Sequence, residues 1–324
     1  MTAARELIQS EIRAHGPMPF SRFMEIALYH PQFGYYRRGQ KVFGREGDFY
    51  TASQLQPVFG RLLACVFQQL GAPAQPDGRV IVADWGAGQS DLREVLDSFD
   101  YRAIDAGRDE TPERFRGIVL ANELFDALSV DVARRADGVW RECRVAARDD
   151  GFAWTDGSAL EGEWLEYAQR AAREARWDSD AAIVELPVAL RSCIERIDRK
   201  LERGWIVAFD YGYTSRELVR FPQGTLMGYR KHRAFDDVLS EPSERDITAH
   251  VPFDELRRCA RSTGWNEVHF ESMGQFLLRA GENDRFAATL AAASEAEALR
   301  LRLQLKSLLF DIGETFRAIV WEKA

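Results

Sequence analysis

The feature that most constrains the fold is an apolar strand that runs directly into a glycine turn. Residues 80–83 read Val-Ile-Val-Ala, Asp84 follows, and glycines stand at 86 and 88 before Ser90. A continuous β-branched run is typical of a strand covered on both faces, and the glycines let the backbone turn sharply beside a ligand. Asp105 ends the next short strand, at a separation where an acid commonly binds a ribose hydroxyl pair. The segment predicts a doubly wound α/β fold with an adenosine-type ligand.

The turn alone leaves the ligand open among nicotinamide, flavin and S-adenosylmethionine. A dinucleotide fold places its third glycine where Leu92 and Arg93 stand here, which disfavours the nicotinamide alternative. S-adenosylmethionine needs room above the turn and an acid for its ribose, and Asp84 could face its cationic amine. The bland alternative is a tight connection between strand and helix that binds nothing.

Composition restricts the partners and the location. Lys and Arg number 43 against 51 Asp and Glu, which gives a net charge of −8, whereas nucleic acid binding needs a basic face. The cysteines are far apart and match neither a zinc site nor a disulfide framework: Cys65, Cys143, Cys193 and Cys259. No apolar run approaches the roughly 20 residues of a membrane helix, and the N-terminus lacks the apolar centre of a signal peptide. We therefore expect a cytoplasmic protein without nucleic acid, membrane or metal.

Hydrophobic periodicity and turn residues predict the elements. Helices are expected at residues 3–14, 22–29 with Ser21 as the cap, about 57–70, 190–201 with Gly204 as the stop, 253–263 and 284–309. Strands are expected at 80–83, 101–104, 117–120, 205–209, 268–270 and 316–321, with an antiparallel meander at 130–154.

Two parts flank or interrupt the predicted core. Residues 1–78 form an N-terminal helical and loop segment that we expect to cover the cofactor site, and residues 79–324 form the Rossmann-like domain. Residues 214–251 lack a period and are rich in charge, so we expect a long insertion on the substrate side.

Short motifs over nearly the whole chain match one known family, in order. They include Phe23-Met24, Gly34-Tyr35-Tyr36, Gly47-Asp48-Phe49, Asn122-Glu123, Phe125-Asp126-Ala127-Leu128, Asp210-Tyr211-Gly212, Gly224-Thr225-Leu226, Asp246-Ile247-Thr248-Ala249-His250-Val251 and Gln275-Phe276-Leu277. In these motifs the chain resembles the MidA family of S-adenosylmethionine-dependent methyltransferases. The resemblance implies a class I methyltransferase core with added antiparallel strands, S-adenosylmethionine as cofactor, and a protein arginine as substrate. Because the family includes a mitochondrial complex I assembly factor, it also suggests a respiratory complex subunit as the protein substrate.

Arginine methylation needs carboxylates that grip a planar cation and orient its nitrogen. Glu123 and Asp126 follow a strand end, three positions apart, and would face one cleft if the chain turned helical there. They are the expected catalytic pair, with His250 as a candidate proton acceptor because imidazole titrates near neutrality. The alternatives are that Asp126 caps a helix, Glu123 is a solvated loop acid and His250 is a hydrogen-bonded structural group.

The other expected contacts depend on the resemblance. The expected cofactor-binding residues are Asp48, Thr51, Asp84, Gly86, Ala87, Gly88, Asp105 and Asn122. The expected substrate-binding residues are Asp210, Tyr211, His232 and Asp246. Asp48 and Thr51 would otherwise satisfy their own turn, His232 would otherwise be structural, and Asp246 would otherwise pair with Arg245 or Arg230 on the surface.

The chain departs from the family pattern near the cofactor. Ala87 and Ser90 replace a proline and a glycine of the turn, and Gln54 stands where the family commonly has glutamate. Residues 106–116 are too few for the customary helix, strand and helix between the second and fourth core strands. A second hypothesis is therefore a catalytically weak relative that holds the cofactor and acts as an assembly or interaction factor.

Overall fold

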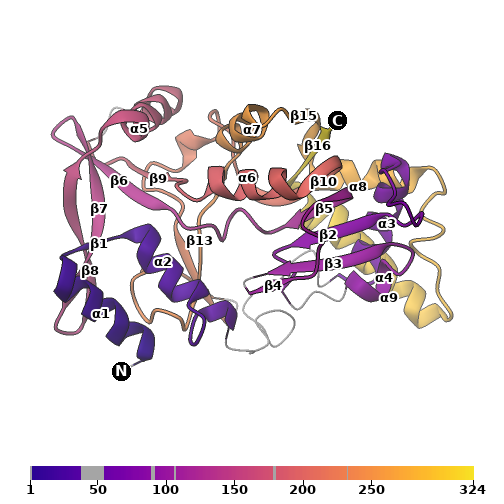
Figure 1. Cartoon of the computed structure of the whole chain (residues 1–324), viewed down its shortest axis with the longest axis horizontal. Coiled ribbons are helices and arrows are strands. Elements are labelled where there is room, and N and C mark those ends of the chain that lie inside the picture. Colours follow the sequence, from indigo (N-terminus) through magenta and orange to yellow (C-terminus); the bar gives the residue numbers. More distant parts are fainter. Residues whose placement is uncertain (1, 38–54, 89–91, 106, 178–179, 232) are drawn as a thin grey trace.

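A central mixed sheet organises the half of the molecule that follows the glycine turn (Figure 1). The computed structural model describes residues 2–37, 55–88, 92–105, 107–177, 180–231 and 233–324. The strand order is β15 (Asn266–Ser272), β16 (Phe316–Lys323), β10 (Leu201–Tyr213), β5 (Phe115–Asn122), β2 (Ile81–Trp85), β3 (Asp100–Asp105) and β4 (Arg108–Asp109). Strands β3, β2, β5 and β10 are parallel, whereas β16 is antiparallel to both of its neighbours. The predicted α/β fold is confirmed.

The sheet has a topological switch point beside the glycine turn. Strand β2 pairs with β3 on one side and with β5 on the other, so the chain order reverses at β2. In an open α/β sheet, ligands bind outside the carboxyl ends of the strands at such a point. The ends of β2, β3, β5 and β10 therefore define the edge where the site must lie.

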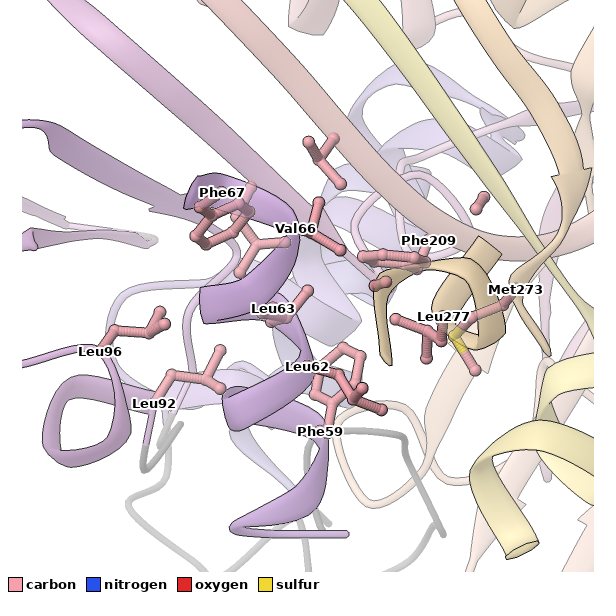
Figure 2. Packing of buried hydrophobic residues seen from close by; sticks show 14 of the residues in the cluster. Phe59, Leu62, Leu63, Val66, Phe67, Leu92, Leu96, Phe209, Met273 and Leu277 are labelled. Atoms are coloured by element: carbon pink, nitrogen blue, oxygen red, sulfur yellow. The ribbon is translucent and has the colours of Figure 1, made fainter. Parts of the chain in front are cut away.

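Helices cover both faces of this sheet. One face packs against α3 (Val58–Leu70), α4 (Leu92–Val95), α8 (Met273–Glu282) and α9 (Glu295–Lys306), and the other against α6 (Leu190–Lys200) and α7 (Phe253–Ser262). Figure 2 shows Phe59 of α3 beside Phe209 of β10, whose ring centroids lie 5.8 Å apart. Alternate residues of each strand serve the two cores, as the period of a pleated strand requires.

A second sheet forms the other end of the molecule (Figure 1). Its order is β1 (Met18–Pro19), β7 (Val139–Arg148), β6 (Asp131–Ala136) and β9 (Ile183–Leu186), with β8 (Gly151–Ala159) on β7. The antiparallel pairing of β6, β7 and β8 confirms the predicted meander. Helices α1 (Ala3–His15) and α2 (Phe20–Tyr29) share a core with this sheet, and α5 (Gly162–Ala175) packs against β9. The division of the chain at residue 78 stays a prediction.

The insertion contains regular structure that the sequence analysis did not predict. Strands β12 (Arg233–Phe235), β11 (Met227–Arg230) and β13 (Asp246–Thr248) form a small antiparallel sheet, and η3 (Leu218–Arg220) precedes it. Strand β14 (Val251–Pro252) then joins the end of β10. Strands of two to four residues are too short to show a period, so their pairing depends on tertiary contacts.

Three expected boundaries are wrong. Phe20, not Arg22, begins α2, and the N–H of Ser21 donates to Asp131 at 2.9 Å instead of Ser21 capping the helix. Gly204 lies inside β10, where a Cβ would stand 1.8 Å from the carbonyl oxygen of Gly117. The expected helix at 284–309 begins too early, because turns and irregular chain follow α8 and the helix α9 starts only after its N-cap Ser294. Segment η4 (Ser307–Asp311) and α10 (Ile312–Thr315) then lead into β16.

The shortened segment after β3 forms a hairpin with the two-residue strand β4. Glu110 stabilises this hairpin, because its carboxylate accepts the N–H of Ala103 at 3.0 Å and pairs with Arg93 and Arg108. These donors lower the pKa of Glu110 to about 2. No helix stands between β3 and β5 in the described residues of this segment, as the sequence predicted.

Candidate functional site

The glycine turn after β2 is built by two left-handed glycines. Gly86 has φ +77° and Gly88 has φ +52°, and the N–H groups of Gly86 and Ala87 both donate to the carbonyl of Ile104, at 2.8 and 3.2 Å. A Cβ on Gly86 would lie 3.2 Å from Leu124. The turn is thus held against the end of β3, and the positive φ of Gly86 together with the close Leu124 disfavours a side chain at that position, which suits a ligand that must approach the backbone closely.

Two acids flank this turn in different ways. Asp84 is buried within β2 and accepts a hydrogen bond from the hydroxyl of Tyr101 at 2.5 Å. Asp105 is the last residue of β3, at the carboxyl edge, and is only half-buried. Of the two, Asp105 has the position expected for a group that binds ribose hydroxyls.

The end of β5 places an amide and a carboxylate side by side. Asn122 donates through Nδ2 to Glu123 at 3.2 Å, while its buried Oδ1 has no hydrogen-bond partner in the described part of the chain. Glu123 adopts φ +52°, and its N–H donates to the carbonyl of Phe209 at 2.9 Å. A left-handed non-glycine residue costs roughly 1–2 kcal/mol, so the surrounding contacts must hold this conformation. The orphan Oδ1 is an acceptor that fits the ammonium group of a methionine moiety.

Asp126 and Asp210 form a buried acidic pair beyond this strand end. Asp210 accepts the N–H of Phe125 at 2.8 Å and that of Tyr211 at 2.9 Å. Burial, and then the charge of Asp126, raises the pKa of Asp210 well above its usual range. Asp210 therefore fixes the loop that carries Asp126. Residues 123–128 form turns and bends rather than a helix, so neither the expected helical spacing nor the alternative of a helix cap applies to Asp126.

The Asp126 carboxylate is 5% exposed, and burial raises its pKa to about 6. The hydroxyl of Tyr211 opposes this increase, although neither that hydroxyl nor Oδ1 of Asp126 has a partner of standard hydrogen-bond geometry in the described residues. Asp126 is a buried carboxylate with acceptor capacity to spare, as a cation-binding group requires.

A second buried carboxylate, Asp246, comes from β13 of the insertion. It is 3% exposed and accepts the hydroxyl of Tyr36 at 2.8 Å, whereas Arg230 and Arg245 both pair with Glu241. The alternative of a surface ion pair between Asp246 and Arg230 or Arg245 is therefore wrong. The N–H of Ala249 donates to the carbonyl of Asp126 at 2.9 Å, which ties the insertion to the loop after β5.

Tyrosines from the N-terminal segment and the insertion surround the two carboxylates. Tyr29 stacks on Tyr36 with ring centroids 5.5 Å apart, and its hydroxyl donates to the carbonyl of Ala127 at 2.6 Å. Burial, and then the charges of Asp246 and Asp126, raise the pKa of both tyrosines well above the usual range. Tyr229 of β11 has its pKa raised by burial and by the same two carboxylates.

His250 lies against the ring of Tyr211 at 5.4 Å and that of Phe221 at 5.0 Å between centroids. Its backbone N–H donates to Oγ1 of Thr225 at 3.0 Å. Burial, and then the charge of Arg220, lowers the pKa of His250, and Nδ1 has no hydrogen-bond partner among the described residues. The ring is therefore neutral at pH 7.

Glu185 of β9 stabilises the backbone at Thr225 and Leu226, next to His250, and this residue was not among those expected from the sequence. Its buried carboxylate accepts the N–H groups of Thr225 at 2.6 Å and Leu226 at 3.2 Å. A Cβ on Gly224 would lie 2.5 Å from the same oxygen. The sequence could have indicated Glu185 as a residue with a structural role, because it is an acid inside the apolar run Ile183–Leu186 and a buried acid needs a hydrogen-bond partner.

The structure brings most of the expected residues to one edge of the main sheet. Asn122, Glu123, Asp126, Asp210, Tyr211, Asp246 and His250 lie there, next to the turn formed by Gly86, Ala87 and Gly88. Asp48, Thr51, His232 and the turn residue Ser90 lie outside the described residues. Tyr29 and Tyr36 were missed as site residues, although Tyr36 belongs to one of the motifs that carried the resemblance. The individual roles stay predictions.

Residues 100–270 match a family described as S-adenosyl-L-methionine-dependent methyltransferase. The chain belongs to this family. Among curated relatives, the protein arginine methyltransferase NDUFAF7 homolog, mitochondrial, of Drosophila melanogaster is 25% identical over 88% of this chain and 76% of its own. The homolog of the same name from Caenorhabditis elegans is 23% identical over 97% of this chain and 85% of its own.

One solved structure that is similar to this chain contains a bound ligand. A COG1565 superfamily member from Burkholderia thailandensis, bound to S-adenosyl-homocysteine, is 29% identical, covers 99% of this chain and 92% of its own, and has a TM-score of 0.82. A native crystal structure of a COG1565 protein from the same organism is 30% identical, with a TM-score of 0.81 over 99% and 91% of the two chains. The resemblance to the MidA family, the class I methyltransferase fold and S-adenosylmethionine as cofactor are confirmed.

The curated relatives are named mitochondrial proteins, and the expected cytoplasmic location is therefore wrong. None of the described helices has the length and apolar character needed to cross a bilayer. The described residues also contain no group of His, Cys, Asp and Glu that could hold a metal ion.

Proposed function

We propose that this methyltransferase transfers a methyl group to the guanidinium group of an arginine in a protein substrate. The observation that carries the proposal is the pair of buried carboxylates, Asp126 and Asp246, among tyrosine rings at the carboxyl edge of the sheet. The names of the curated relatives, protein arginine methyltransferases, support it.

The chemistry of the pair suits a guanidinium better than a neutral group. A guanidinium ion is planar, always charged and less strongly hydrated than an ammonium ion, so it can enter a buried site if carboxylates neutralise it. Asp126 and Asp246 supply that charge, and the faces of Tyr29, Tyr36 and Tyr229 can lie against a cation. A neutral substrate would not offset the buried charge of Asp126.

The cofactor supplies a methyl group on a cationic sulfur. We propose that the turn at Gly86 and Gly88, with Ala87 between them, and the buried Asp84 shape the adenosine side of its site. Asp105 would hold the ribose hydroxyls and Oδ1 of Asn122 the ammonium group. Asp48 and Thr51 are the proposed contacts from the N-terminal loop.

In the transfer step, a guanidinium nitrogen forms a bond to the methyl carbon while the carbon–sulfur bond breaks, and S-adenosylhomocysteine leaves. The attacking nitrogen then loses one proton. We propose that Asp126 accepts this proton, because burial raises the pKa of its carboxyl group to about 6, closer to neutrality than that of an ordinary aspartate. Glu123 would orient the nitrogen, and the neutral ring of His250 is the second candidate acceptor. Asp210 holds the loop that carries Asp126 by accepting the N–H of Phe125, and Tyr211 and His232 are proposed to contact the substrate.

We further propose that the protein substrate is a subunit of a respiratory complex. This inference rests on the family resemblance alone and names no subunit.

Transfer of labelled methyl from S-adenosylmethionine into a mitochondrial lysate tests the function. Acid hydrolysis followed by mass spectrometry should recover the label as methylarginine, and Glu123→Gln should reduce incorporation by about 10- to 100-fold because a charge-assisted contact is lost. Label recovered in lysine or another residue would overturn the arginine proposal, and equal incorporation by Glu123→Gln would remove Glu123 from the mechanism.

A further inference from the structure

The hairpin that follows Asp105 offers little side chain to a ligand. Gly107 has none, and the two charged residues of β4 are paired with Glu110 and with Lys200, each at 2.7 Å. An adenine base is bonded directly to its ribose, so a ribose held by Asp105 places the base within one sugar ring of this hairpin. A bound base needs apolar or planar groups against its faces. The described residues after Asp105 in the hairpin supply no such group.

A planar group from a distant part of the chain lies on this hairpin instead. The terminal nitrogens of Arg37 lie 2.5 and 2.7 Å, and its Cζ 3.0 Å, from the position that a Cβ on Gly107 would take. Because both nitrogens are nearer than the carbon, the guanidinium group meets Gly107 with its edge, and this contact does not use the faces of its plane. Gly107 has φ +78°, and its lack of a side chain makes the close approach possible.

The position of Arg37 is set by the short helix that it ends, η1 (Tyr35–Arg37). Tyr35 is buried in the core next to the second sheet, and the hydroxyl of Tyr36 donates to Asp246 at 2.8 Å. Two consecutive residues of η1 therefore reach Asp246 on one side and the hairpin after β3 on the other. This anchoring holds the Arg37 side chain next to the proposed ribose site.

We propose that Arg37 forms one wall of the adenine site, with its guanidinium plane stacked against the base of S-adenosylmethionine. Guanidinium groups are planar and stack on aromatic faces, and some RNA-binding proteins hold unpaired bases in this way. Aromatic rings stack on bases as well, so the contact depends on a flat group at this position more than on its charge. The inference rests on the proposed placement of the ribose at Asp105 and does not depend on arginine as the substrate.

Calorimetric titration of the full-length chain with S-adenosylhomocysteine tests this inference. Arg37→Ala should raise the dissociation constant by about 5- to 100-fold, the effect of removing one stacking partner from a base. Arg37→Lys keeps the charge without the plane and should bind as weakly as Arg37→Ala. Arg37→Phe supplies a plane without the charge and should stay close to the wild type. Arg13→Ala is the matched control, because Arg13 is an exposed arginine on α1 of the same N-terminal segment.

A ligand without the base separates stacking from a general effect on the site. S-ribosylhomocysteine keeps the ribose and the amino acid part but lacks adenine, so Arg37→Ala should bind it like the wild type, measured by the rise in Tm at millimolar ligand. Arg37 is exposed, and its replacement should leave the Tm of the ligand-free chain unchanged.

Wild-type affinity of Arg37→Ala for S-adenosylhomocysteine would overturn the inference. Equal weakening with S-ribosylhomocysteine would also overturn it, as would an Arg37→Lys variant that binds normally beside an Arg37→Phe variant that does not, because the charge would then be the important property. Asp105→Ala tests the ribose placement separately. Wild-type affinity in that variant would show that the ribose placement itself is wrong.

Discussion

At the scale of single residues, Asp126 is where stability and function oppose each other. Burial raises the pKa of its carboxyl group from 3.8 to about 6. A raised carboxyl pKa means that the folded state prefers the protonated form, so this group's contribution to stability is full below about pH 4 and is lost as the pH rises through about 6. The charged carboxylate is thus retained at a cost in stability, as expected of a binding group.

We predict that Asp126→Asn raises the free energy of unfolding at pH 7 and lowers kcat/KM by about 10- to 100-fold, the loss of one charge-assisted contact. The wild-type kcat/KM, which reports the free enzyme, should rise with pH through about 6, and Asp126→Asn should remove that inflection. Urea titration and initial rates measure the two effects. Asp236→Asn changes an exposed aspartate of the insertion and serves as the control. An unchanged pH profile in Asp126→Asn would contradict the assignment.

At the scale of elements, the corner between β9 and the insertion depends on one carboxylate. Glu185 accepts the N–H groups of Thr225 and Leu226, and Thr225 in turn accepts the backbone N–H of His250. Glu185→Ala leaves two buried donors without an acceptor, at about 1–3 kcal/mol for each. Burial raises the pKa of Glu185, so a neutral amide is tolerated there and its carbonyl oxygen can still accept both bonds.

We therefore predict that Glu185→Ala lowers the free energy of unfolding by about 2 kcal/mol or more and weakens substrate binding, whereas Glu185→Gln stays close to the wild type. Thr225→Val should raise KM with a smaller loss of stability, because it leaves one donor rather than two without an acceptor, and Thr225→Ser should restore KM because the hydroxyl acceptor returns. Urea unfolding and steady-state kinetics give both quantities. If Glu185→Gln were as impaired as Glu185→Ala, the charge rather than the acceptor geometry would be the important property.

A helix or strand could be predicted from the sequence where one local sequence rule determines it. The strand and turn at residues 80–88 combine a continuous apolar run with two glycines, and the structure confirms both. Gly204 was expected to end a helix because a glycine after a helical pattern usually marks a stop, whereas here it lets β10 approach Gly117 of β5 closely. The strands of the insertion have no local rule to reveal them, since they are only three or four residues long and β11 pairs with β13 across the intervening loop.

At the scale of the whole molecule, the site is assembled from parts that only tertiary packing brings together. Tyr36 from the N-terminal segment, Asp126 from the loop after β5 and Asp246 from the insertion meet across more than 200 positions of sequence. Sequence position gave Glu123 and Asp126 as the pair, because they are neighbours in the chain. Asp246 was expected to bind the substrate but not to lie beside Asp126; it is also buried, and its proximity to Asp126 follows from contacts such as that between Ala249 and Asp126.

Cofactor binding should be measurable as stability of the whole molecule, separately from the substrate. A ligand that binds only the folded chain adds about 2.7 kcal/mol at 100 times its dissociation constant. We predict that S-adenosylhomocysteine raises the Tm of the wild type and that Asp105→Ala loses most of this shift, because the ribose hydroxyls lose their charged acceptor at the end of β3. Asp126→Asn should keep the full shift, since Asp126 is proposed to contact the substrate rather than the cofactor. A full rise in Tm in Asp105→Ala would show that the ribose binds elsewhere. Loss of the rise in Tm in Asp126→Asn would show that Asp126 also contributes to cofactor binding.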